Sequence, residues 1–153
     1  MLACAYLIEV GSHRYVGITQ SFMRRLGEHW RRCMDCSFMS PLYHMIRESS
    51  DSQSVSGRIL AVYDIPSVRC SGKDMNISER INSRIMEKLE YFWVKDLEAD
   101  MTNHRIMKYS SKHLRELHEK YWISHGGGRT MSLSEAYDIV IPSNEIIYEL
   151  EEN

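Results

Sequence analysis

The apolar positions in the first twenty residues are typical of two short strands. Residues 5–10 and 13–16 are rich in residue types that favour extended backbone. The two residues between these runs, Gly11 and Ser12, suit a tight turn. The pattern therefore predicts a β-hairpin at the start of the chain.

After Ser21, a suitable helix N-cap, the apolar period becomes that of a helix. The expected helix covers residues 22–33, and a second, shorter one covers residues 41–48. The apolar stripe of the first helix consists of Phe22, Leu26, Trp30 and Cys33.

A serine-rich stretch at residues 49–57 predicts an exposed loop, and residues 58–65 predict a third strand. Residues 67–75 are expected to form another loop. Asn76 and Glu79 fit a capping box that opens a long helix to about residue 99. We expect an α+β fold, in which a small central antiparallel or mixed three-stranded sheet is flanked by helices.

We expect one domain at residues 1–105 and a C-terminal extension of unknown role at residues 106–153. The extension predicts helices at 110–121 and 132–138, a flexible glycine break at 126–128 and a strand at 146–149. Its histidine spacings do not converge on a metal site, so we expect surface histidines at His104, His113, His118 and His125.

The composition is that of an ordinary globular protein, with 43% hydrophobic and 26% charged residues among 153. No apolar run approaches the length of a membrane span, and the N-terminus lacks the pattern of a signal peptide. We therefore expect a cytoplasmic, intracellular protein with free thiols. One C-x2-C pair, Cys33 and Cys36, is too little for a typical structural zinc site.

The net charge of −2 is unevenly distributed. Residues 1–47 carry six arginines against three acidic residues, and the excess of acidic residues lies in the remainder. A polyphosphate would be drawn to the N-terminal part, although asymmetry of this size is common in small proteins.

Three local features carry candidate chemistry. The first is the hairpin tyrosines, Tyr6 and Tyr15, of which the latter precedes Gly17 by two residues. The second is the pair Arg25 and His29, which share one helix face bordering the apolar stripe. Each feature alone also fits a structural role, as core tyrosines, a snorkelling arginine and a satisfied histidine.

The third feature is Glu90, which stands among apolar helical neighbours. A carboxylate in such surroundings is costly unless it is paired or bound to a metal. The alternative at this point is a salt bridge to an arginine. The neighbours are Met86, Trp93, Val94 and Leu97.

Taken in order, these residues resemble the GIY-YIG nuclease domain over residues 4–105, most closely that of phage homing endonucleases. Residues 4–6 (Cys-Ala-Tyr) stand for the first motif and residues 15–17 (Tyr-Val-Gly) for the second. The arginine, histidine, glutamate and asparagine of the family match Arg25, His29, Glu90 and Asn103. The chain departs from the family in lacking Gly-Ile at residues 4–5 and a lysine at residues 18–19, and its hairpin is shorter.

The resemblance implies a divalent-metal-dependent endonuclease that hydrolyses double-stranded DNA. Glu90 would hold a single Mg²⁺ or Mn²⁺, and Arg25 would stabilise charge on the phosphate. Tyr15 is the leading candidate for the base and His29 its rival, and Tyr6 would position the water or the phosphate. The supporting residues are Gly17, Arg24 and Asn103.

Two other readings remain open from the sequence. One is a non-cleaving DNA-binding module with a GIY-YIG-like fold, and the other is an unrelated interaction protein. Because one site of this kind cuts one strand, double-strand cleavage would need a homodimer or two sequential events.

Overall fold

A computed structural model describes residues 1–66, 75–102 and 109–140, with side chains described from residue 84 onward in the second range. The first half contains β1 (Leu2–Val10), β2 (His13–Thr19), α1 (Phe22–Met34), α2 (Pro41–Glu48), the 3-10 turn η1 (Ser52–Ser54) and β3 (Ser56–Asp64). The second half contains α3 (Met75–Leu97), α4 (Ser111–Tyr121), β4 (Trp122–Ser124), the turn η3 (Gly126–Gly128), β5 (Thr130–Ser132) and a helix over residues 133–140.

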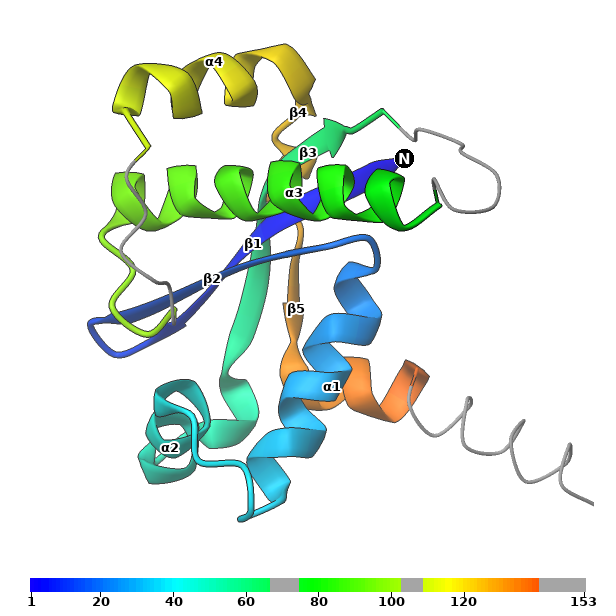
Figure 1. The fold of residues 1–153 in the computed structure, drawn as a ribbon. Helices are drawn as coiled ribbons and strands as arrows, with labels where there is room; N and C mark the ends of the chain where they lie inside the picture. Colours follow the sequence, from blue (N-terminus) through cyan, green and yellow to red (C-terminus); the bar gives the residue numbers. More distant parts are fainter. Residues whose placement is uncertain (67–74, 103–108, 141–153) are drawn as a thin grey trace, which may run out of the picture.

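The expected α+β class is confirmed, and the sheet is antiparallel (Figure 1). Its path runs β2-β1-β3-β4, and β5 also pairs with β3. The three strands predicted for the sheet are present, but the sequence analysis missed β4 and β5. These two short strands pair with opposite ends of β3, at Val62–Tyr63 and at Ser56–Arg58.

The N-terminal hairpin forms around the predicted turn. Val10 pairs with His13, and Gly11 has a φ of 61°, a conformation that glycine adopts without steric cost. In α2, proline occupies the first turn, and the Ser40 hydroxyl accepts a hydrogen bond from the Tyr43 amide at 3.4 Å. Local turn and cap chemistry therefore accounts for both elements.

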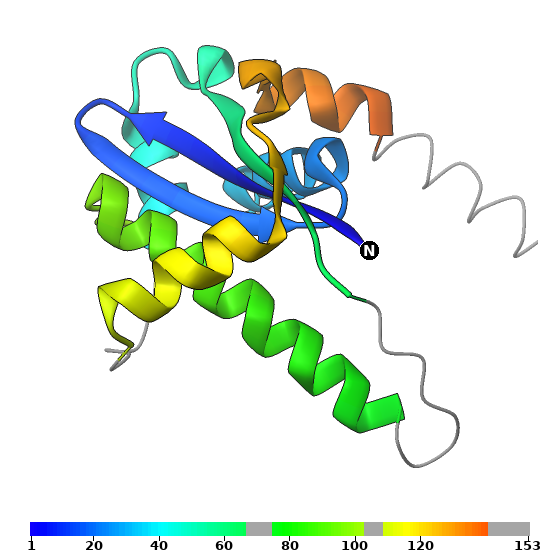
Figure 2. The same ribbon diagram turned by 90° about the horizontal axis from the view of Figure 1, so that it is seen from above.

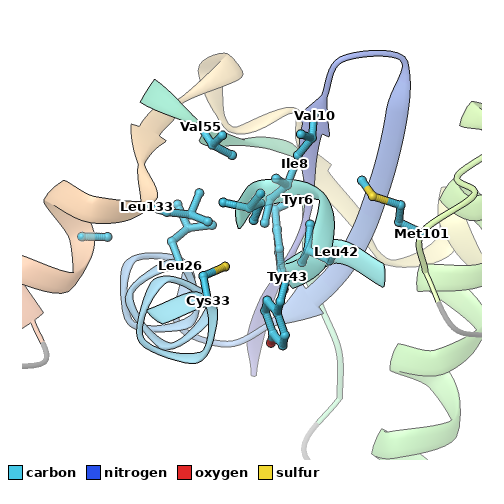
Figure 3. Close-up of a cluster of buried hydrophobic side chains, with 12 residues drawn as sticks. Tyr6, Ile8, Val10, Leu26, Cys33, Leu42, Tyr43, Val55, Met101 and Leu133 are labelled. Atoms are coloured by element: carbon cyan, nitrogen blue, oxygen red, sulfur yellow. The ribbon is translucent and has the colours of Figure 1, made fainter. Parts of the chain in front are cut away.

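Helices cover both faces of the sheet (Figures 1 and 2). The helices α3 and α4 lie on one face, and α1, α2 and the 133–140 helix lie on the other. Because successive strand residues face opposite ways, β1 serves both cores. Tyr6, Ile8 and Val10 point toward α1 and α2 (Figure 3), whereas Ala5 and Leu7 belong to the core beneath α3.

The extension is built into this sheet, and one of its histidines is not a surface group. His118 of α4 is half-buried, and its Nδ1 lies 2.7 Å from the hydroxyl oxygen of Tyr63 in β3. The same hydroxyl accepts a hydrogen bond from the Trp93 indole of α3 at 2.8 Å. The expectation of a surface histidine holds only in part here, because the network that joins α3, α4 and β3 covers one side of the His118 ring.

Several predictions lie outside the described residues. These are the side chains of the capping box, Asn103, His104, the strand at 146–149 and all of the predicted loop at 67–75 except Met75, which begins α3. Of the cysteines within the described ranges, Cys4 and Cys33 are buried, Cys36 is exposed, and all three are free thiols. In the described part of the chain, no helix has both the length and the apolar character needed to cross a membrane.

Candidate active site

Tyr6 lies at the centre of the candidate site. It stands on β1 opposite Gly17 of β2, and only 1% of it is exposed. A Cβ atom on Gly17 would come within 2.3 Å of the Tyr6 hydroxyl oxygen. Glycine is therefore required at this position so that the tyrosine ring can lie over the neighbouring strand.

His29 of α1 is buried against Tyr6, on the helix face that borders the apolar stripe. It is 1% exposed, and its Nε2 lies 2.7 Å from the Tyr6 hydroxyl oxygen. Its Nδ1 lies 3.0 Å from the hydroxyl oxygen of Tyr43 in α2. Burial, together with the positive charges of Arg25 and Arg32, lowers the pKa of His29 to about 3. The imidazole is therefore neutral at physiological pH.

Arg25 lies one helical turn before His29 and reaches the same tyrosine. Its charge and a side-chain hydrogen bond lower the pKa of Tyr6, although burial keeps that pKa well above its ordinary value. Arg25 also donates to Glu28 at 3.1 Å, and Glu28 lies 3.6 Å from the exposed Arg24. A carboxylate therefore holds the Arg25 guanidinium at the edge of the site.

Tyr15 is the more accessible of the two tyrosines. It is half-buried, and its ring meets the His29 ring edge to face at a centroid distance of 5.2 Å. Its pKa is raised by burial and by Glu90, whereas Arg25 and a hydrogen bond from Tyr6 lower it. The Tyr15 oxygen therefore lies among an arginine, a carboxylate and a second hydroxyl.

Glu90 of α3 is half-buried, and its charge raises the pKa of Tyr6 and that of Tyr15.

The segment after α3 joins this helix to the open edge of β2 through hydrogen bonds. Asp100 accepts from the Arg14 amide at 2.8 Å, and Thr102 accepts from the Val16 amide at 2.7 Å. These bonds fix the end of α3 beside the strand that carries Tyr15.

The structure thus brings together Tyr6, Tyr15, Gly17, Arg25, His29 and Glu90 from four elements, with Arg24 at the rim. Sequence reasoning missed Tyr43, which bonds His29, and Glu28, which pairs with Arg25. A Glu three residues after an arginine on a helix is a recognisable pairing signal. Nothing local to Tyr43 indicates that α2 packs onto His29.

None of the protein-family models, curated proteins and solved structures with which the chain was compared matches it.

Proposed function

We propose that this protein is a divalent-metal-dependent endonuclease that hydrolyses phosphodiester bonds of double-stranded DNA. One observation carries the proposal: two tyrosines meet at His29, with the Tyr6 hydroxyl 2.7 Å from Nε2 and the Tyr15 ring 5.2 Å from the imidazole ring. Arg25 and Glu90, from different helices, shift the pKa values of both tyrosines. An arginine, a carboxylate and two hydroxyls supply the charge stabilisation, cation ligand and proton-transfer groups that phosphodiester hydrolysis needs. The resemblance to GIY-YIG nucleases supports the same reading.

The donor set suits a hard divalent cation. In the described residues, no three histidine, cysteine or acidic side chains gather as a ready-made metal site. Glu90 is the carboxylate whose charge raises the pKa values of both tyrosines. A single carboxylate is often enough to hold Mg²⁺, because waters and substrate phosphates supply the other ligands. When bound, Mg²⁺ or Mn²⁺ would neutralise phosphate charge and offset the effect of Glu90 on the tyrosine pKa values.

The protein groups then have separate tasks. Arg25 donates to the phosphate oxygens, where a planar guanidinium can make two parallel hydrogen bonds. Tyr15, the half-buried member of the pair, would accept the proton of the attacking water as the tyrosinate. Its own hydroxyl proton must first leave to solvent, and the positive charge of Arg25, which lowers the Tyr15 pKa, favours that loss. His29 is a weaker candidate for the base, because both of its ring nitrogens face tyrosine hydroxyls. Tyr6 orients Tyr15 through their hydrogen bond.

The test is nicking of supercoiled plasmid DNA with Mg²⁺ or with excess chelator. Wild type should cleave only with the metal, and Glu90→Gln should abolish cleavage because an amide is a poor ligand for a hard cation. The matched control is Glu87→Gln, the same change at an exposed position one turn earlier in α3. It should cleave like wild type.

Thermal melting of both variants controls for folding. Cleavage by Glu90→Gln at the wild-type rate would remove this carboxylate from the mechanism. DNA binding by wild type without cleavage under any divalent metal would favour the non-cleaving DNA-binding module instead. Comparing the rates of nicking and linearisation across protein concentration tests whether a homodimer makes double-strand breaks.

A further inference from the structure

A chain of three hydroxyl groups and one imidazole runs through the core from α2 to the candidate active site. It begins at Tyr43, passes through His29 to Tyr6 and ends at Tyr15, whose ring centroid lies 6.3 Å from that of Tyr6. Three of the four side chains are at least 95% buried, with Tyr43 5% exposed and Tyr6 and His29 1% exposed each. Solvent therefore does not set the direction in which these three side chains donate.

The imidazole allows two directions. A neutral histidine donates from one ring nitrogen and accepts at the other, so the hydroxyls of Tyr6 and Tyr43 play opposite roles. Either Tyr43 donates to Nδ1 and Nε2–H donates to Tyr6, or Tyr6 donates to Nε2 and Nδ1–H donates to Tyr43. The two arrangements contain the same atoms and differ only in where the protons lie.

The surroundings of Tyr43 favour the first arrangement. Among the described residues, His29 Nδ1 is the only hydrogen-bond partner of the Tyr43 hydroxyl. In the second arrangement the Tyr43 proton would have no acceptor among the described residues, whereas in the first only a lone pair of the Tyr43 oxygen is unused. Buried donors without partners are the rarer and costlier case.

The surroundings of Tyr6 lead to the same direction. Arg25 has only donors, so it occupies one acceptor position of the Tyr6 oxygen. When His29 Nε2–H fills the other acceptor position, the single Tyr6 proton is left to donate to Tyr15.

We propose that Tyr43 is a positioning residue: its hydroxyl holds His29 as the Nε2–H tautomer and thereby directs the Tyr6 proton toward the Tyr15 oxygen. In this series of hydrogen bonds, each group from Tyr43 onward donates to the next one. The last acceptor is the Tyr15 oxygen, which takes the proton of the attacking water in the proposed function. The consequence for catalysis rests on the proposed function, but the tautomer of His29 does not.

The experiment reads the tautomer directly, by long-range proton–nitrogen correlation NMR of the ¹⁵N-labelled wild-type protein. The chain has seven histidines, and His29→Gln assigns the signals of His29 by removing them. We expect a protonated nitrogen at Nε2 and an unprotonated one at Nδ1. A protonated Nδ1 in the wild type would overturn the proposal, and this measurement needs neither DNA nor a folded Tyr43 variant.

The second arm uses Tyr43→Phe, which removes only the hydroxyl. The His29 Nδ1 resonance should move toward that of a nitrogen without a hydrogen bond, and kcat for plasmid nicking should fall about five- to tenfold, as for loss of one buried neutral hydrogen bond. The matched control is Tyr63→Phe, which removes a buried hydroxyl 2.7 Å from His118 on the other face of the sheet. It should change neither the His29 signals nor kcat.

The two proposals fail separately. If the wild-type protein does not cleave DNA but carries Nε2–H at His29, the nuclease function is contradicted and the proposed direction of the hydrogen bonds stands. If the wild-type protein cleaves DNA but carries Nδ1–H at His29, only the proposed direction of the hydrogen bonds is contradicted. An unchanged Nδ1 resonance in Tyr43→Phe also overturns the role of Tyr43.

Discussion

Tyr15 and His29 adjoin each other, yet their surroundings suit them to different tasks. Tyr15 is half-buried, whereas His29 is enclosed, with a hydroxyl at each ring nitrogen. Burial and the nearby arginines take the pKa of His29 to about 3, so it is a weak proton acceptor at neutral pH. We therefore assign it the orientation of tyrosines and assign Tyr15 the proton transfer.

Single substitutions across a pH series test this division of labour. Tyr15→Phe should lose nearly all cleavage at every pH, because the accepting oxygen is gone. His29→Ala should retain a reduced rate, on the order of 1% to 10% of wild type, because it removes support rather than the base. The measurement is single-turnover nicking of plasmid DNA by folded protein. A greater loss in His29→Ala than in Tyr15→Phe would reverse the assignment.

At the scale of elements, the approach of β2 to β1 shapes the site. Gly17 leaves room for the Tyr6 ring, and the hydrogen bonds of Asp100 and Thr102 to β2 fix the end of α3 on the other side of the same strand. The hairpin therefore does more than carry two tyrosines, since it also sets their distance from α1 and α3.

Gly17→Ala tests this close approach. Because the new Cβ would lie 2.3 Å from the Tyr6 hydroxyl oxygen, the ring must shift. Overpacking of this kind costs about 1–3 kcal/mol of stability. We expect cleavage to fall on the order of a hundredfold, as when reacting groups are misplaced by about 1 Å.

The control for this prediction is Gly128→Ala in the turn between β4 and β5. Gly128 has a φ of 65° with open space around its Cβ position, so alanine adds backbone strain of about 1–2 kcal/mol without touching the site. Urea denaturation should report comparable stability losses in the two variants, and only Gly17→Ala should lose cleavage. Full activity in Gly17→Ala would mean that the position of Tyr6 is not critical.

For the whole molecule, burial of His29 makes stability depend on pH. Its folded pKa of about 3 lies below the ordinary value of 6.5, so the unfolded chain binds the proton first as pH falls. This contribution to stability is fully present above pH 6.5 and is lost progressively as pH falls toward 3. The loss is about 1.4 kcal/mol per pH unit at most.

Urea denaturation between pH 7 and pH 4.5 checks this dependence of stability on pH. The range runs downward from just above the ordinary histidine pKa of about 6.5. The free energy of unfolding should fall with pH more steeply in wild type than in His29→Gln, which cannot titrate there. Parallel curves for the two proteins would contradict a buried, neutral His29.

Local chemistry in the sequence determined much of the framework. The Gly11 turn, the apolar period of α1 and the Ser40–Pro41 start of α2 act over a few residues, so the pattern alone located the hairpin and both helices. The helical spacing of Arg25 and His29 likewise predicted that they border the buried face. The family resemblance, not the periodicity, brought Glu90 into the same set.

Tertiary structure alone decided the rest, because those features depend on segments far apart in the chain. The short strands β4 and β5 carry too few residues for a period-two pattern, and they exist because β3 offers an edge. Tyr43 and His118 look like ordinary helix residues until the packing brings each against a buried partner. The pKa of His29 likewise follows from the enclosure of its ring by α1, α2 and β1, which no run of neighbouring residues encodes.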